Sequence, residues 1–381
     1  MKKKFLIVTT VSDSLPFFKG QVNVLKESFD IELVSSSGIH LNEMCDFHCV
    51  KGHAVKMRRE ISLYNDIVSL VELIFLFLKV KPYIVHGNTP KASLLSMIAA
   101  WVTRIPKRIY YVHRLRYHGE FGNKRKILML MERISCFFAT DVISVSQGVK
   151  DVMISDVLCK KDIVLIWNGS VNGIDLNYFD PEISDLKSIR SSYGIQEDDF
   201  VFGFIGRLVG DKGINELVAA FKKINIQNSN TKLLLIGRFE NDLDPLEELT
   251  IQEIENNKDI IHAGFQKDVR PFFKAMDVFV FPSYREGFGI VLMEAGAMNV
   301  PSISSDIIGC NEIIVNNING FLIRSRDEIK LNQKMAFCFN NKEKLKKMSV
   351  SARNSIIENF EQQKLWQKSL EVYQKIVNSQ Y

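Results

Sequence analysis

Two glutamates that flank a glycine-rich turn form the most informative stretch of this sequence, Glu286-Gly287-Phe288-Gly289-Ile290-Val291-Leu292-Met293-Glu294. It follows an apolar run at 277–281 and Pro282, a pattern that predicts a buried strand ending in a loop. Apolar residues then recur at helical spacing, so a helix should begin at the glycines. Unpaired N–H groups at a helix N-terminus lie at the positive end of its dipole, where a phosphate can bind. Two ordinary surface glutamates beside a turn are the alternative interpretation.

A second glycine-rich loop carries two positive charges. Residues 200–205 have the apolar character of a strand, and Gly206-Arg207-Leu208-Val209-Gly210-Asp211-Lys212-Gly213 leads from it to a helix that begins at Ile214. An arginine fork and a lysine point charge together suit a diphosphate. A turn with solvated charges is the simpler explanation of either residue alone.

The first stretch, EGFGIVLME preceded by FPSYR, resembles the signature of retaining glycosyltransferases of family 4, which have the GT-B fold. The 206–213 loop resembles the second motif of that family, and the resemblance is strong over 200–323 but weak over 1–180. It implies that Glu286 holds the hydroxyls of the donor sugar and Glu294 those of a ribose. It also assigns Arg207 and Lys212 to the pyrophosphate of the donor.

Other positions match the family at the ends of expected strands. His113 follows the strand at 108–113 and corresponds to a histidine near the donor sugar, so the expected catalytic residues are His113, Arg207, Lys212 and Glu286. Arg114, however, stands where the family usually has Gly or Asp. The resemblance also implies a set of nucleotide-sugar contacts: Gly20, Gly206, Arg238, Gly264, Phe265, Gly287, Phe288, Gly289, Ile290 and Glu294.

The elements that must position these residues alternate between strand-like and helix-like segments. This alternation predicts an α/β protein with parallel, doubly wound sheets and ligands at the carboxyl ends of the strands. We expect strands at 5–10, 30–35, 47–55, 83–87, 108–113, 141–145 and 163–166 in the first half, with helices from 21, at 65–78, 92–101 and 124–138. In the second half we expect strands at 200–205, 232–236, 260–263 and 278–281, and helices at 268–276, 328–340, 342–359 and 361–378. The long apolar segment 67–80 should be a buried helix, because charged residues interrupt it before it could span a membrane.

Two Rossmann-like domains facing each other across a cleft are the architecture that the resemblance implies. A segment dense in turn formers at 168–175 marks the boundary between them. Residues 1–175 should bind the acceptor and residues 176–360 the nucleotide sugar, while the helix at 361–381 packs back on the first domain.

Composition and motifs exclude several other kinds of protein. The six cysteines are scattered without zinc spacing, and no secretory signal peptide is visible, so a cytoplasmic protein is expected. The pair Asp242 and Asp244 could chelate a metal, but Pro245 and the acidic run after it favour a helix start instead. We therefore expect neither a metal nor a cofactor, and no nucleic acid as a partner.

Positive charge is concentrated in the first half of the chain. Residues 1–180 contain 24 Lys and Arg against 17 Asp and Glu, whereas residues 181–381 contain 25 against 27. Basic residues at 124–126 open a helix with an apolar face made of Ile127, Leu130, Met131, Ile134, Phe137 and Phe138. That helix could pack in the core, or it could lie on an anionic membrane surface.

These observations favour a metal-independent, retaining glycosyltransferase. The expected donor is a UDP-sugar, with an N-acetylhexosamine as one candidate, and the expected acceptor is a glycan on a polyprenyl diphosphate. Family relatives of this kind assemble capsule or O-antigen at the inner face of the cytoplasmic membrane. A GT-B UDP-sugar 2-epimerase and a two-lobed binding protein without activity are the alternatives.

Overall fold

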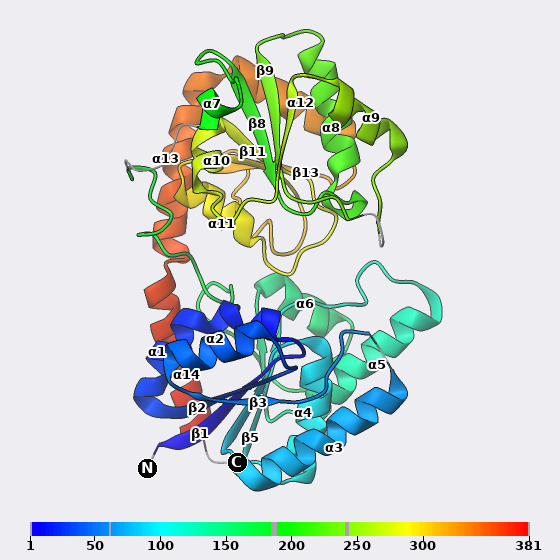
Figure 1. The fold of residues 1–381 in the computed structure, drawn as a ribbon, viewed down its shortest axis with the longest axis vertical. Coiled ribbons are helices and arrows are strands. Elements are labelled where there is room, and N and C mark those ends of the chain that lie inside the picture. Colours follow the sequence, from blue (N-terminus) through cyan, green and yellow to red (C-terminus); the bar gives the residue numbers. More distant parts are fainter. Residues whose placement is uncertain (1, 61, 184–188, 241–243, 380–381) are drawn as a thin grey trace. The chain divides into compact units, whose positions relative to one another are not determined.

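A computed structural model describes residues 2–60, 62–183, 189–240 and 244–379. The chain forms two compact units (Figure 1). Unit 1 comprises Met1–Gly173 and Gln362–Tyr381, and unit 2 comprises Ile174–Glu361. The chain therefore passes from unit 1 to unit 2 after Gly173 and returns to unit 1 for its last helix.

Unit 1 is built on a parallel sheet in the order β3-β2-β1-β4-β5-β6-β7. Its strands are β1 (Lys3–Val8), β2 (Phe29–Ser35), β3 (Lys51–Ala54), β4 (Ile84–Gly87), β5 (Lys107–Val112), β6 (Asp141–Ser144) and β7 (Ile163–Leu165). The central strands are apolar and buried, as strands covered by helices on both faces must be. Because chain order reverses beside β1, loops after β1 and β4 leave the sheet at a topological switch point, where α/β proteins place ligands.

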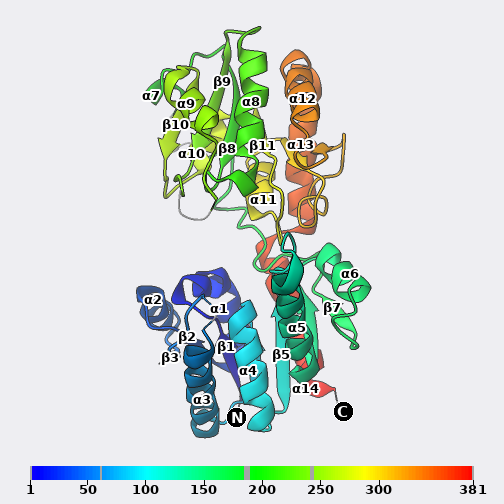
Figure 2. The same ribbon diagram turned by 90° about the vertical axis from the view of Figure 1, so that its right-hand side faces the viewer.

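Helices cover both faces of this sheet. They are η1 (Ser12–Phe18), α1 (Lys19–Ser28), α2 (Ile39–His48), α3 (Leu63–Val80), α4 (Pro90–Val102), α5 (Gly122–Phe138), α6 (Gln147–Ser155) and α14 (Gln362–Asn378). α3, α4 and α5 lie side by side over one face, and α1 and α14 lie over the other (Figures 1 and 2).

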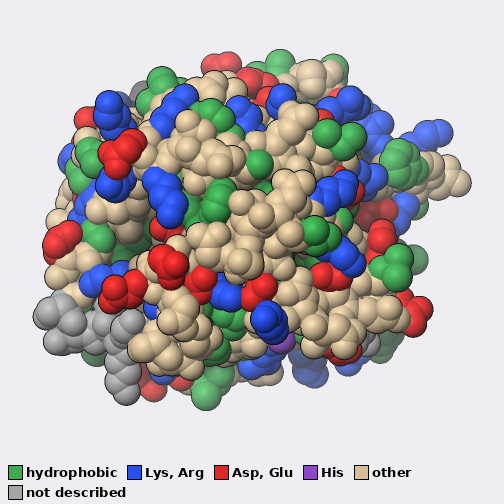
Figure 3. Space-filling model, turned by 90° about the horizontal axis from the view of Figure 1, so that it is seen from above, with side chains coloured by type: hydrophobic (Ala, Val, Ile, Leu, Met, Phe, Trp, Pro, Cys, Tyr) green, Lys and Arg blue, Asp and Glu red, His purple; other side chains and the backbone are tan. Residues whose placement is uncertain are grey.

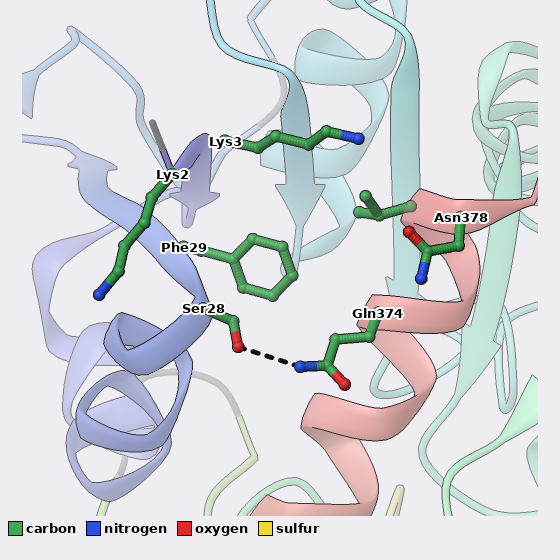
Figure 4. A pocket seen from close by; sticks show the side chains of 7 residues that line it. Lys2, Lys3, Ser28, Phe29, Gln374 and Asn378 are labelled. Atoms are coloured by element: carbon green, nitrogen blue, oxygen red, sulfur yellow. Dashed lines mark hydrogen bonds between the residues drawn. The ribbon is translucent and has the colours of Figure 1, made fainter.

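The last helix, α14, is held in unit 1 by close packing and hydrogen bonds. A Cβ added to Gly20 would lie 1.8 Å from the ring of Trp366, so only glycine admits this helix at that point. Deeper in the unit, the Tyr373 hydroxyl lies 3.0 Å from His86 Nε2. Near the C-terminus, Gln374 donates to Ser28 Oγ at 3.0 Å beside a small surface pocket (Figure 4).

Unit 2 repeats the plan with a parallel sheet in the order β10-β9-β8-β11-β12-β13. Its strands are β8 (Phe200–Ile205), β9 (Thr231–Ile236), β10 (Ile260–Gly264), β11 (Val278–Phe281), β12 (Ser302–Ser305) and β13 (Gly320–Ile323). Its helices are α7 (Ile189–Ser192), η2 (Gly210–Lys212), α8 (Ile214–Asn225), α9 (Glu248–Asn256), α10 (Arg270–Ala275), α11 (Ile290–Ala297), α12 (Glu328–Asn340) and α13 (Lys342–Asn359). β8 and β11 are neighbours, so the loops that follow them leave the same edge of the sheet side by side.

The α/β, doubly wound fold predicted from the sequence is confirmed, with three local corrections. The strand expected at 47–55 is wrong in its first half, because Leu41, Met44 and His48 recur at helical spacing and are buried on α2. The segment 67–80 is a helix but not a buried one, since only Ser69, Leu73 and Phe77 of α3 are buried. α6 was not expected, although Ser146 caps it by accepting from Val149 N at 3.1 Å.

Candidate active site

The carboxyl ends of β8, β9 and β10 build an aromatic and basic pocket in unit 2. Four of the predicted site residues line it: Gly206, Arg207, Arg238 and Phe265. Its volume is roughly 430 Å³, within the range of small-molecule sites. The Arg238 guanidinium lies 4.6 Å from the centre of the Phe265 ring, which is 62% exposed and so presents a face to a planar ligand.

Glycines allow the loops of this pocket to approach one another closely. A Cβ on Gly237 would lie 1.7 Å from the Gly206 carbonyl oxygen, and both glycines have positive φ angles. Gly264, with a φ of 66°, accepts a hydrogen bond from Gly237 N at 2.9 Å. The predicted glycines therefore shape the pocket through their backbones.

Glu240 lies on the pocket wall and was not predicted. Its carboxylate pairs with Arg207 at 2.8 Å, and both side chains are more than 40% exposed. Gln266 and Val269 also line the pocket without having been predicted. The position of Gln266 directly after Phe265 was an available signal, whereas the pairing of Glu240 with Arg207 depends on the tertiary fold.

The loops after β8 and β11 bring Lys212 and Glu286 together. Their side chains form an ion pair, and each is only 15% exposed. The Ser283 hydroxyl also donates to Glu286 Oε1 at 3.0 Å, which fixes the carboxylate. Gly213 makes this approach possible, because a Cβ there would lie 2.2 Å from the Pro282 carbonyl oxygen. Lys212 and Arg207 leave the same strand, so this loop serves both the pocket and the ion pair.

The start of α11 offers fewer free amides than its glycines suggest. Gly289 N donates to Gly309 O at 2.9 Å, and Ile290 N donates to Phe288 O at 2.9 Å. For the amides of Gly287 and Phe288, no acceptor is recorded among the residues that the structure describes. The Phe288 side chain packs against Phe360 in the core, so only its backbone can meet a ligand.

Glu294 lies in the second turn of α11 as a carboxylate without a recorded partner in the described part of the chain. Burial raises the pKa of Glu294 to about 7. Among the described residues, neither the lining of the aromatic pocket nor the ion pair of Lys212 includes it. A half-charged, unpartnered carboxyl of this kind is ready to accept hydrogen bonds from hydroxyl groups of a ligand.

In unit 1, His113 follows β5 and is fixed by its neighbours. Its Nε2 lies 3.3 Å from Asn88 Oδ1, and its ring lies 4.5 Å from that of Tyr111. Phe18, at the end of η1, meets the same ring edge-on. Burial lowers the pKa of His113 to about 4, so the imidazole is neutral at neutral pH. Gly20 lies in the same unit, where its contact with Trp366 accounts for the glycine.

Of the acidic pair weighed as a metal site, Asp242 lies outside the described residues. Asp244 accepts from Asp211 N at 2.5 Å, and its carbonyl accepts from Gly210 N at 3.1 Å. This aspartate therefore closes the turn that carries Lys212.

Comparison with known proteins places both halves of the chain in known families. Residues 25–171 match the family described as Glycosyltransferase Family 4, and residues 185–355 match Glycosyl transferases group 1. The capsular polysaccharide biosynthesis glycosyltransferase CapM of Staphylococcus aureus is 35% identical over 97% of each chain. An Escherichia coli enzyme, UDP-Gal:alpha-D-GlcNAc-diphosphoundecaprenol alpha-1,3-galactosyltransferase, is 29% identical over 88% of this chain and 86% of its own.

Among solved structures, Anabaena HepE in complex with UDP superimposes with a TM-score of 0.81. The alignment covers 98% of this chain and 100% of HepE at 19% identity. A structure of HepE with UDP-glucose aligns equally well. At this identity the likeness establishes a common fold, the GT-B fold expected from the sequence.

Proposed function

The chain belongs to the family 4 glycosyltransferases, and we propose that it transfers a sugar from a UDP-sugar to a lipid-linked glycan with retention of configuration. The observation that carries this proposal is the arrangement in unit 2, where an aromatic pocket and the Lys212–Glu286 pair share the loop after β8. Assembly of a bacterial capsule is the proposed setting, because the Staphylococcus aureus relative bears that description over nearly the full length of both chains.

The pocket suits a nucleotide. A planar base can stack on the exposed Phe265 ring, and the Arg238 guanidinium behind the ring favours such a contact. Glu294 would accept the ribose hydroxyls, and Arg207 would exchange Glu240 for the diphosphate. Breaking the Arg207–Glu240 pair costs little, because exposed ion pairs contribute about 0–1 kcal/mol.

The reaction places charge where this site has complementary groups. As the glycosidic bond breaks, negative charge grows on the β-phosphate of the leaving UDP. Lys212, Arg207 and the amides of Gly287 and Phe288 would stabilise that charge, as preorganised cations and dipoles do. Glu286, held by Ser283, would orient the hydroxyls of the donor sugar. His113 is neutral and fixed by Asn88, so we assign it to contact with the sugar rather than to charge transfer.

The acceptor would attack from the face that the phosphate leaves, with the leaving oxygen as the base. This route requires no second carboxylate and no metal. The alternatives, a UDP-sugar 2-epimerase and a binding protein without activity, predict different products. Detection of UDP release from a panel of UDP-sugars, with and without a polyprenyl-diphosphate-linked glycan, tests the proposal. Acceptor-dependent release supports transfer, whereas free 2-epimerised sugar or no release contradicts it.

A membrane surface is the proposed location of the acceptor, and unit 1 offers a face for it. Among the large apolar side chains of the helices α3, α4 and α5 that are more than 40% exposed are Ile67, Val71, Phe75, Leu78, Trp101, Val102, Ile127, Leu130 and Phe137. We call these side chains the apolar outer face. The exposed charged residues of the same three helices are all basic: Lys79, Lys124, Arg125, Lys126 and Arg133.

This composition favours the membrane over the core for α5. Three residues of the apolar face that the sequence predicts for α5 are exposed: Ile127, Leu130 and Phe137. The buried residues of α5 do not belong to that predicted face. In contrast, acidic and basic side chains are interspersed on the face drawn in Figure 3, and hydrophobic atoms form small separate groups there. An apolar surface surrounded by basic residues suits an anionic bilayer. No described helix is long and apolar enough to cross a bilayer.

A further inference from the structure

A groove in unit 1 has no part in the reaction described above. It runs between β3, the edge strand of the sheet, and α3, which packs against α4. Its volume of roughly 1020 Å³ lies just above the usual range for small-molecule sites, about 300–1,000 Å³. Space of this size can hold a large ligand.

The wall formed by α3 is largely apolar. Helical spacing divides α3 into three faces: Ser69, Leu73 and Phe77 are buried, and Ile67 belongs to the apolar outer face. The third face, which includes Val68 and Leu76, lines the groove, and Phe75 of the apolar outer face borders the groove as well. Val55 and Met57 line it from the opposite side. A hydrocarbon chain could therefore lie between the two elements.

One end of the groove is polar and basic. Lys56 and Arg58 follow β3, and Ser36 and Ser37 follow β2, so these residues lie at the carboxyl edge of the sheet. His113 follows β5 at the same edge. Lys56 and Arg58 are exposed, and neither has an ion pair recorded with any described residue. The groove also contains Glu72, whose carboxylate is engaged by Lys56 N at 2.9 Å.

We propose that this groove binds the polyprenyl diphosphate carrier of the acceptor, with the diphosphate at Lys56 and Arg58 and the isoprenoid chain along Val68 and Leu76. The proposal rests on the proposed function for the presence of such an acceptor. Charge complementarity selects this ligand. Lys56 and Arg58 have no ion pair recorded with the described residues and suit a diphosphate, the Glu72 carboxylate in the groove is already engaged by the Lys56 amide, and the apolar side chains of the wall suit a hydrocarbon. The groove adjoins the apolar outer face through α3, so a chain drawn from a bilayer would reach it directly.

The first test measures direct binding of prenyl diphosphates to the full chain by calorimetry. Geranylgeranyl diphosphate should bind several-fold more tightly than farnesyl diphosphate, and both should bind at least tenfold more tightly than inorganic pyrophosphate. Farnesol, which lacks the diphosphate, should bind at least tenfold more weakly than farnesyl diphosphate. Equal binding of pyrophosphate and geranylgeranyl diphosphate would overturn the proposal, as would equal binding of farnesol and farnesyl diphosphate.

Matched variants then separate the groove from the membrane face. Val68→Glu places a charge in the groove, and Ile67→Glu places the same charge on the neighbouring residue of the apolar outer face. Val68→Glu should weaken geranylgeranyl diphosphate binding at least tenfold, whereas Ile67→Glu should change it less than twofold and instead reduce sedimentation with phosphatidylglycerol vesicles. Equal effects of the two variants on the prenyl diphosphate would refute the groove.

A surface pair provides the same comparison without risk to the core. Arg58→Ala should weaken the prenyl diphosphate severalfold, while Arg59→Ala should not, because Arg59 pairs with Asp13 and does not line the groove. UDP binding, measured in parallel, should be unchanged in all four variants. If the enzyme releases no UDP from any UDP-sugar but still discriminates among prenyl diphosphates through Val68, the proposed function fails and the groove stands.

Discussion

The effect of Glu294 on the stability of the protein can be predicted, in sign and in size, from the surroundings of its carboxyl group. Burial raises its pKa from 4.5 to about 7, and no hydrogen bond compensates the charge in the described part of the chain. Between these two values the folded protein binds more protons than the unfolded chain, so this group makes the protein less stable as pH rises from 4.5 to 7. Above that window the cost is constant. Glu294→Gln removes the titration and keeps the shape of the side chain.

The shift sets the magnitude of this effect. A difference of roughly 2.5 pKa units at about 1.36 kcal/mol per unit gives an upper bound of about 3 kcal/mol for the cost of the charged carboxyl. Glu294→Gln should therefore stabilise the ligand-free protein at pH 8 by as much as ~3 kcal/mol, and the gain should disappear near pH 4.5. At roughly 2–4 °C per kcal/mol for a unit of this size, the melting temperature should rise by at most about 6–12 °C.

The same substitution should harm nucleotide binding, because an amide accepts fewer hydrogen bonds from ribose hydroxyls than a carboxylate does. We expect UDP to bind roughly tenfold more weakly to Glu294→Gln at pH 8. In the wild type, UDP should bind more weakly as pH falls below 7, because the proton competes with the ribose for this carboxylate. Thermal unfolding at pH 5 and pH 8, combined with UDP calorimetry, provides the assay, and Glu255→Gln at an exposed position of α9 is the matched control. The reasoning is refuted if the stability difference does not grow with pH, or if UDP affinity is unchanged.

Three further predictions address the remaining groups. Lys212→Ala should lower turnover at least tenfold, which corresponds to about 1.4 kcal/mol in the activation free energy, and should affect UDP affinity less. EDTA should leave the turnover of the wild type unchanged. A smaller loss of turnover in the variant, or a magnesium requirement in the wild type, would contradict the proposed chemistry. Glu240→Gln should strengthen UDP binding by up to about fivefold by freeing Arg207, as calorimetry can measure; weaker binding would mean that Glu240 itself contacts the nucleotide. Charge reversal at residues 124–126 should abolish sedimentation of the protein with anionic liposomes, and added salt should weaken the sedimentation of the wild type. The same reversal at Lys344, Lys346 and Lys347 of α13 should leave sedimentation unchanged. Equal sedimentation of the two variants would exclude α5 from the membrane contact.

The fold was predictable because its signals are local. Apolar runs of four to six residues, each followed by glycine or a polar loop, locate the central strands of both sheets, and their alternation with helices requires parallel pairing. The failure at 47–55 has the same origin. The segment Phe47 to Val55 contains apolar residues at short spacing, which resembles a strand. However, Leu41 and Met44 begin a helical pattern that continues into this segment, and its buried residues stabilise the helix α2.

The candidate site was predictable only as a set of loops. Strand ends and glycines indicate where Arg207, Lys212 and Glu286 leave the sheet, but not which side chains they meet. Glu240, which pairs with Arg207, belongs to no motif, because its role depends on a contact between two separate segments of the chain. Ser283, which hydrogen-bonds to Glu286 three residues later, lies in the FPSYR stretch and was therefore an available signal. Gly20 was predicted from a local motif, but the structural reason for this glycine is its packing against Trp366. Most of the chain separates the two residues.

Hydrophobic periodicity in α3 and α5 did not distinguish a buried face from an exposed one. An amphipathic pattern predicts that one side of a helix is apolar, and that side can pack equally well against a protein core or a bilayer. Only the packing shows that α3 and α5 place their buried residues on narrow faces and leave Phe75 and Phe137 in contact with solvent. The proposed membrane contact therefore rests on one observation, that these exposed apolar side chains lie on neighbouring helices whose exposed charged residues are all basic.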